Sequence, residues 1–564
     1  MPAAMEWEAI ASRHRLEQQR NIPQEWRISD DQLAKLRGKG TAEEGRLIAQ
    51  DVARKSALLT GKELDITECY NARELLDKIH HKKLTSEEVA VAFCKRAALA
   101  QQLVRTFPSR SVTTSCLTEI FFDEGIKRAR ELDQHLERTG ELVGPLHGLP
   151  ISLKDSFVVR GHYATVGYVE FLKRPLPTSN SAMVDLLVDA GAVLFCKTNV
   201  PQTMMTADSE NNIFGRTLNP HKTILTAGGS TGGEGALVAF RGSVLGVGSD
   251  IAGSIRIPSL CCGIYGFKPT ADRTPFGGQA NYPFRKLQLP GVTPVAGPMA
   301  NSVDDLSLFM ETVIGRRPWH YDASAVNAPW RSSYGSNKTL AIGILPEDPE
   351  YPLQPPVRRA LQDAVSKLTG AGHSIVKLPA NPACSASVGG KLGFHYFGLG
   401  SSGLDALASE IGEPLVHSVK RGVHPFTTSK PLISTELDTV HQLDEFLGLQ
   451  ASYANSWKNI WTEYHLDVVV GPGAISTAVP HDTYGIPVYT LMWNVLDYPA
   501  GIIPYGVSSK TRDPNYQKAA SNFEADYDPE ATDGAPCSLQ VIAPRFYDEE
   551  CLNAMRIIDR DIQA

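Results

Sequence analysis

The eight residues GGSTGGEG at positions 228–235 place five glycines around Ser230 and Thr231. A loop of this composition can bind phosphate through its bare backbone N–H groups. Its first five residues also match G-x-S-x-G, the pattern of a nucleophile elbow. Other segments of the chain must therefore be used to distinguish a phosphate-binding loop from a nucleophile elbow. The two features belong to different α/β folds.

Neither nucleotide-binding pattern is complete in this sequence. A Walker loop needs lysine after its last glycine because the amine must reach the outer phosphates. Here Glu234, of the opposite charge, follows Gly233. A dinucleotide fingerprint starting at Gly246-x-Gly248 would need a third glycine at the position of Ile251. The loop is therefore not interpreted as a phosphate site.

The nucleophile elbow also lacks its expected context. An elbow follows directly on a buried strand and needs an acid and a histidine downstream. The segment before Gly228 is NPHKTILTA, whose proline and polar residues make a poor buried strand. None of the downstream histidines stands in a distinctive motif: His373, His395, His417, His424, His441, His465 and His481.

A serine–serine–lysine set fits the chain better. Ser254 lies in GSDIAGSIRIPS, downstream of Ser230, and Lys154 lies upstream in GLPISLKDSF. A lysine can act as the base for a serine hydroxyl only if its pKa, ~10.4 in water, is lowered by burial. The flanking Ile151 and Phe157 predict such burial for Lys154.

The three motifs that contain these residues resemble those of the amidase signature family. Three further segments, TNVPQTMM, CGIYGFKPT and LDYPAG, also resemble sequences of that family. The resemblance extends over about residues 60–555. Within the family, the sequences of these motifs are most similar to those of the acetamidase or general amidase branch, which is related to the fatty acid amide hydrolases. The resemblance implies an α/β fold whose central mixed, twisted β-sheet is covered by helices on both faces.

The resemblance also implies the roles of individual residues. Ser254 would be the nucleophile that forms an acyl-enzyme. Ser230, joined to Gly229 by a cis peptide bond, would relay the proton, and neutral Lys154 would be the final base. The expected substrate-contacting residues, which include an oxyanion hole of backbone N–H groups at 251–254, are Met204, Ser230, Ile251, Ala252, Gly253 and Ser254.

Several neighbouring polar residues are interpreted as structural. We expect Asp250 and Arg256 to hold the nucleophile loop by hydrogen bonds. Asp155 should point away from Lys154, since adjacent residues of a strand face opposite sides. The pair at 80–81, two histidines, has no third ligand at metal spacing, so no metal and no cofactor are expected. The hydroxyl of Thr231, where many relatives have serine, should keep its hydrogen bond.

Composition excludes several function classes. The 564 residues carry 55 basic and 62 acidic side chains, and the net charge of −7 gives no general attraction for nucleic acid or an anionic membrane. No apolar run is long enough to span a bilayer, and the amino-terminal stretch lacks the features of a signal peptide. We therefore expect a cytoplasmic protein. Its nine cysteines are expected to be reduced, with the adjacent pair at 261–262 buried.

The chain is predicted to consist of a helical arm over residues 1–60 and one amidase domain over 61–564. Helices are expected at 82–104, with a capping box formed by Thr85 and Glu88, and at 119–142. Short apolar runs from residue 144 onward predict buried strands alternating with helices. The polar stretch 105–115 is interpreted as an insertion or a gene-model artefact.

The resemblance to the amidase signature family implies an amidase that hydrolyses a small-molecule monocarboxylic acid amide to carboxylate and ammonia. Three alternatives stay open: a fatty acid amide hydrolase-like enzyme, an amidotransferase-type subunit and, least favoured, a non-enzymatic ligand-binding relative. The identity of the amide and the oligomeric state, including a homodimer, also stay open.

Overall fold

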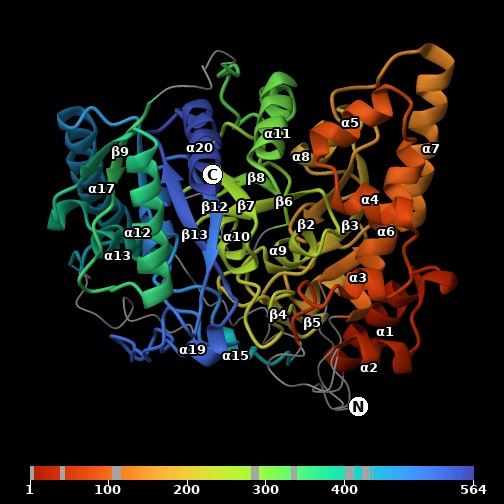
Figure 1. Ribbon diagram of the computed structural model, residues 1–564, viewed down its shortest axis with the longest axis horizontal. Coiled ribbons are helices and arrows are strands. Elements are labelled where there is room, and N and C mark those ends of the chain that lie inside the picture. The colour runs from red at the N-terminus through yellow and green to blue at the C-terminus, as the bar shows by residue number, and fades with distance from the viewer. Residues whose placement is uncertain are drawn as a thin grey trace.

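The computed structural model describes residues 6–37, 45–103, 116–280, 291–331, 339–399, 412–421, 432–434 and 436–564 (Figure 1). The predicted insertion at 105–115 lies outside these residues. The predicted division into an arm and a domain at residue 60 stays a prediction.

A mixed sheet of eleven strands runs through the described part of the chain. Its order is β1-β3-β2-β6-β8-β7-β12-β13-β11-β9-β10. Parallel pairs (β3–β2–β6 and β11–β9–β10) flank a central antiparallel part. The strands are β1 (Leu117–Ile120), β2 (Pro150–Lys154), β3 (Val193–Thr198), β6 (Leu245–Asp250), β7 (Tyr265–Lys268), β8 (Val295–Ala300), β9 (Ala341–Ile344), β10 (Ser374–Lys377), β11 (Val468–Gly471), β12 (Ala500–Val507) and β13 (Pro536–Ile542). A separate hairpin pairs β4 (Glu210–Asn211) with β5 (Gly215–Arg216).

Helices pack on this sheet and confirm the predicted α/β class. In Figure 1, α6 and α7 lie on the β3 side of the sheet, and α12, α13 and α17 lie on the β9 side. The longer helices are α1 (Glu6–Arg20), α2 (Asp30–Arg37), α4 (Gly61–Glu68), α5 (Ala72–His80), α6 (Ser86–Leu103), α7 (Phe122–Thr139), α8 (Ala182–Asp189), α9 (Gly232–Ala239), α10 (Arg256–Cys262), α11 (Val303–Gly315), α12 (Pro355–Gly370), α13 (Ala386–Gly398), α17 (Thr439–Glu463), α18 (Val488–Val495) and α20 (Asp548–Gln563). The short helices are α3 (Val52–Lys55), α15 (His417–Arg421) and α19 (Pro529–Thr532).

The predicted capping box of α6 is present. The Glu88 N–H donates to Thr85 Oγ1 (3.0 Å), and the Thr85 N–H donates to Glu88 Oε2 (3.1 Å). This exchange satisfies two N–H groups that the first helical turn leaves without partners.

The helix predicted at 119–142 is wrong at its start. The chain is extended over Leu117–Ile120, where it forms β1 and pairs antiparallel with β3, and α7 begins only at Phe122. All four residues of β1 are buried, so pairing with the sheet outweighs the local helical pattern.

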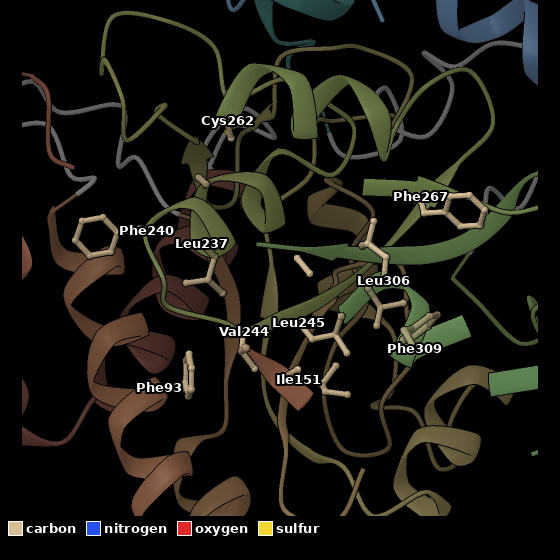
Figure 2. Close-up of a cluster of buried hydrophobic side chains, with 14 of the residues drawn as sticks. Phe93, Ile151, Leu237, Phe240, Val244, Leu245, Cys262, Phe267, Leu306 and Phe309 are labelled. Carbon is tan, nitrogen blue, oxygen red and sulfur yellow. The ribbon is translucent and has the colours of Figure 1, made fainter. Parts of the chain in front are cut away.

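A large apolar cluster fixes the strands that carry the site (Figure 2). Ile151 of β2 and Leu245 of β6 lie beside each other in this view, with Leu237 of α9 and Phe309 of α11 near them, and all four are fully buried. Because β2 and β6 are parallel neighbours, their carboxyl ends lie at the same edge of the sheet. Lys154 ends β2 and Asp250 ends β6, so this edge holds the predicted site.

The cysteine and membrane predictions can be compared with the described residues. All nine cysteines are unpaired, and all except Cys69 are buried. Burial raises the pKa of both adjacent thiols, Cys261 and Cys262, which fits small buried side chains that do not react. Among the described helices, none is long and apolar enough to cross a membrane.

Candidate active site

Lys154 lies at the end of β2 with its amine pointing at two hydroxyl groups. The amine nitrogen Nζ is 2.7 Å from Ser230 Oγ and 2.8 Å from Ser249 Oγ, with the Ser249 carbonyl oxygen at 3.4 Å. Lys154 is 1% exposed, and burial lowers its pKa to about 7, against a smaller opposing effect of Asp250. A buried amine with this pKa is neutral often enough to accept a proton.

Ser230 lies in the glycine loop immediately before α9. The peptide bond from Gly229 to Ser230 is cis, and the Ser230 side chain is 2% exposed. A Cβ atom at Gly229 would lie 2.4 Å from the Thr206 carbonyl oxygen, so only glycine fits this close approach. No strand leads into this loop, in agreement with the rejection of a nucleophile elbow.

Ser254 lies on the turn that joins β6 to α10, where it lines a cavity of about 120 Å³. Gly229, Met204, Ile251 and Ala252 line the same cavity. The structure thus brings most of the predicted substrate-contacting residues to one cavity, with Ser230 buried behind Gly229. Met204 has a left-handed backbone (φ +56°), which sets the direction of the chain where it passes the cavity.

Gly253 differs from the other predicted oxyanion donors. Its N–H donates to Asp250 Oδ1 at 2.8 Å and so holds the turn together. It has φ +124°, and a Cβ atom there would lie 2.3 Å from Thr490 Oγ1, so the turn requires glycine. The N–H groups of Ile251, Ala252 and Ser254 are therefore the stronger candidates for an oxyanion hole.

Asp250 and Arg256 hold the turn that carries Ser254, as predicted. Both side chains are fully buried, and they form a two-point ion pair with distances of 3.0 and 3.1 Å. Burial alone would raise the pKa of Asp250. The Arg256 guanidinium and the hydrogen bonds from Arg256 and Asn494 outweigh this effect and keep the pKa well below its usual range. Asp250 also accepts from the N–H of Ile255 at 3.1 Å, which ties the ion pair to the backbone around Ser254.

Two other acidic side chains near the motifs point away from the cavity. Asp155 accepts hydrogen bonds from the hydroxyls of Thr118 (2.9 Å) and Thr165 (2.8 Å), which confirms that it faces the opposite side from Lys154. Glu234 is buried and accepts from Ser152 Oγ at 2.5 Å. Burial raises the pKa of Glu234 to about 7. Glu234 therefore belongs to the packing of α9 on β2.

Ser249 is the polar neighbour of Lys154 that the sequence analysis missed. It lies on β6, one residue before Asp250, inside the segment GSDIAGSIRIPS, but the sequence analysis assigned it no role. The register of β2 against β6, Leu153 opposite Val247, brings it near Lys154. The alternating faces of β6 would have identified it only once that register was known. Its carbonyl also accepts from Thr231 Oγ1 at 3.4 Å, so the predicted hydrogen bond of that hydroxyl is present.

The site offers no grouping of metal ligands. His80, the last residue of α5, and His81, which follows it, are both exposed. In the described ranges, no group of three or more histidine, cysteine, aspartate or glutamate side chains is arranged to hold a metal ion.

The cavity beside Ser254 is lined by both apolar and polar side chains. Aromatic rings come from α13 (Phe394 and Phe397) and from Phe523. Polar groups come from Asp208, Asp482 and Arg421. These segments are far apart in the sequence, and this explains why the cavity could not be foreseen from any one motif.

Comparison with known proteins agrees with this geometry. A model of the Amidase family matches residues 88–552. An amidase of Gibberella moniliformis is 39% identical, with 100% of each chain covered. An acetamidase of Emericella nidulans is 36% identical, with 97% of this chain and 96% of the relative covered. A solved fatty acid amide hydrolase superposes with a TM-score of 0.86 at 30% identity, covering 100% of this chain and 96% of its own.

The family match and the names of these relatives support an amide-hydrolysing enzyme. They agree with the three motifs around Lys154, Ser230 and Ser254 that the structure brings to one edge of the sheet. The chain therefore belongs to the amidase signature family.

Proposed function

We propose that this protein hydrolyses the amide of a monocarboxylic acid to the carboxylate and ammonia through an acyl-Ser254 intermediate. The observation that carries the proposal is the buried contact of 2.7 Å between Lys154 Nζ and Ser230 Oγ, next to the cavity that Ser254 lines. A base of low pKa, a relay hydroxyl and an accessible hydroxyl are the parts that serine acylation requires.

Ser249 orients the base. A neutral amine has two hydrogens and one lone pair. If the hydrogens are donated to the hydroxyl and the carbonyl of Ser249, the lone pair is left to accept the Ser230 hydroxyl proton. Ser249 is thus a positioning residue for proton transfer.

The reaction then proceeds in two balanced halves. Ser254 Oγ attacks the amide carbon while its proton passes to Ser230 Oγ, and the Ser230 proton passes to Lys154. Lys154 returns a proton through Ser230 to the leaving nitrogen, the C–N bond breaks, and ammonia departs. Water then attacks the ester carbon, and its proton passes through Ser230 to Lys154. Lys154 returns this proton through Ser230 to Ser254 Oγ as the ester C–O bond breaks, which frees the acid, ionised to the carboxylate, and restores Ser254 and neutral Lys154. The N–H groups of Ile251, Ala252 and Ser254 would stabilise the oxyanion, each by ~3 kcal/mol.

The test is ammonia release from a panel of primary amides by wild-type protein and the variants Ser254→Ala, Ser230→Ala and Lys154→Ala. We expect no detectable turnover for Ser254→Ala and a loss of most activity for the other two. A fluorophosphonate probe should label the wild type at Ser254 and should not label Ser254→Ala. Wild-type-like turnover in purified Ser254→Ala would refute the mechanism, and a mild effect of Ser230→Ala would remove the relay role.

Fatty acyl amides are the second candidate substrates. The match to the fatty acid amide hydrolase over the whole chain supports them. A long-chain amide in the panel separates this candidate from the short-chain one.

A further inference from the structure

Residues 413–421, here called the strap, contact the loop of Met204 and reach the lining of the substrate cavity. The strap ends in the short helix α15, which contributes Ser418 and Arg421 to the cavity lining. No motif in the sequence indicated a role for it.

One end of the strap is fastened by Gln202, two residues before Met204. Gln202 is fully buried, and its side-chain Nε2 donates to Glu413 Oε1 (2.8 Å) and to the Pro414 carbonyl (3.3 Å). Its Oε1 accepts from the Val416 N–H (2.9 Å). A buried amide whose donor and acceptor groups are all used imposes a defined geometry on both segments.

Neighbouring groups reinforce the same end. Asn212 Nδ2 donates to Glu413 Oε1 (2.9 Å) and to the Pro414 carbonyl (2.7 Å), and the Val169 N–H donates to Glu413 Oε2 (2.9 Å). Glu413 is 4% exposed, so three donors compensate its burial.

The other end is fastened by Arg421. Its guanidinium donates to the backbone carbonyls of Asp482, Asn522 and Phe523. Asp482 and Phe523 both line the cavity, so Arg421 ties the strap to two further segments of the cavity wall. Between the two ends, the Ser418 and Thr206 hydroxyls lie 3.4 Å apart, and both residues line the cavity.

Three phenylalanine rings form an aromatic part of the cavity wall. Phe394 and Phe397 pack edge to face, with ring centroids 5.9 Å apart, and Phe523 lines the same cavity. Such a wall offers ring faces and edges to a planar apolar group, which pairs with them more favourably than a methyl group does.

We propose that the strap, fastened by Gln202 and Arg421, fixes the width of this cavity and makes the enzyme selective for amides of aromatic acids over acetamide. Gln202 and Arg421 are then positioning residues for substrate selection. The inference rests on the proposed amide hydrolysis.

The experiment compares kcat and KM for phenylacetamide, acetamide and decanamide. We expect wild-type kcat/KM for phenylacetamide to exceed that for acetamide by about tenfold or more, because burial of a phenyl ring is strongly favourable. In Gln202→Met, which keeps the length of the side chain, we expect KM for phenylacetamide to rise about fivefold, the effect of one net hydrogen bond. The kcat for acetamide should stay near the wild-type value.

Two further variants separate selection from folding. Gln102→Met is the matched control, because Gln102 is also buried and donates to the carbonyls of Trp26 and Ala98, none of which lines the cavity. Gln102→Met should lower the thermal midpoint of unfolding without changing the ratio of kcat/KM for phenylacetamide to kcat/KM for acetamide. Arg421→Met releases the other end of the strap and should reduce the same ratio, less than additively with Gln202→Met.

The possible failures are distinguishable. If the wild type releases ammonia from no amide, the proposed function fails. If it is active but prefers acetamide or decanamide, the aromatic selectivity is wrong. If it prefers phenylacetamide and neither Gln202→Met nor Arg421→Met changes the ratio more than Gln102→Met does, the role of the strap is refuted.

Discussion

The titration of Lys154 should set the pH dependence of turnover. Burial lowers the pKa of this amine to about 7. Its neutral fraction then increases from about one-tenth at pH ~6 to about nine-tenths at pH ~8. We expect kcat/KM to rise about tenfold over this interval and to level off above it. A lysine with the ordinary pKa of ~10.4 would make kcat/KM keep rising about tenfold per pH unit through this range.

Initial rates of ammonia release at constant ionic strength measure this profile. Lys197→Met is the matched control, because Lys197 is also fully buried on a neighbouring strand. Its amine contacts the Tyr163 carbonyl and the Asp155 carboxylate (3.5 Å), and neither group is a partner of the Lys154 amine. Its removal should leave the midpoint of the profile unchanged. A profile that is flat, or that still climbs at pH ~9, would refute the assignment of Lys154 as a base of low pKa.

The same pKa predicts an effect on stability with a definite sign. The pKa of Lys154 is lower in the folded than in the unfolded chain, so between pH ~7 and ~10.4 the unfolded chain binds more protons and stability rises with pH. From pH ~7 to ~9 this one group contributes about 2 kcal/mol, an upper limit. Lys154→Met has no titrating amine at this position. Between pH ~7 and ~9, its free energy of unfolding relative to that of the wild type should therefore fall by up to about 2 kcal/mol. Urea unfolding of both proteins at both pH values measures it, and a constant difference would refute the low pKa.

Two other substitutions examine the support of the base and of the nucleophile. Ser249→Ala removes the hydroxyl that orients Lys154. We expect kcat to fall about tenfold, the effect of about one hydrogen bond, while KM stays nearly unchanged. An equally large change in KM would contradict a role of Ser249 in positioning the base. Arg256→Met leaves Asp250 buried without its cation, so we expect a loss of about 3–5 kcal/mol in unfolding free energy. A thermal midpoint close to that of the wild type would show that this ion pair does not hold the turn.

Much of the site could be predicted because its residues lie in short local motifs. Lys154, Ser230 and Ser254 each stand in a segment whose glycines and apolar residues restrict the backbone strongly. The apolar flanks of Lys154 predicted its burial, and the capping box of α6 could be read from Thr85 and Glu88 alone. Local signals of this kind do not depend on how distant segments meet.

The features that could not be predicted depend on contacts between distant segments. Leu117–Ile120 is a strand only because β3 offers it a partner. Ser249 meets Lys154 through the register of β2 against β6, and that register is not encoded by either strand alone. The N–H of Gly253 has a side-chain partner, Asp250, because the turn folds back on the end of β6. The cavity wall joins α13, α15 and residues near 482 and 523, and no periodicity relates them.

The ion pair of Asp250 and Arg256 bears on both the pKa of Lys154 and the anchoring of Ser254. Asp250 favours the charged form of Lys154, although burial outweighs this effect. The carboxylate of Asp250 is surrounded by the Arg256 guanidinium, the Asn494 amide and the N–H groups of Gly253 and Ile255. These donors balance its charge, which limits its attraction for a protonated Lys154, and they also hold the turn on which Ser254 stands. Loss of Arg256 would therefore raise the pKa of Lys154 as well as loosen the nucleophile, and the kcat/KM profile of any folded Arg256 variant should shift to higher pH.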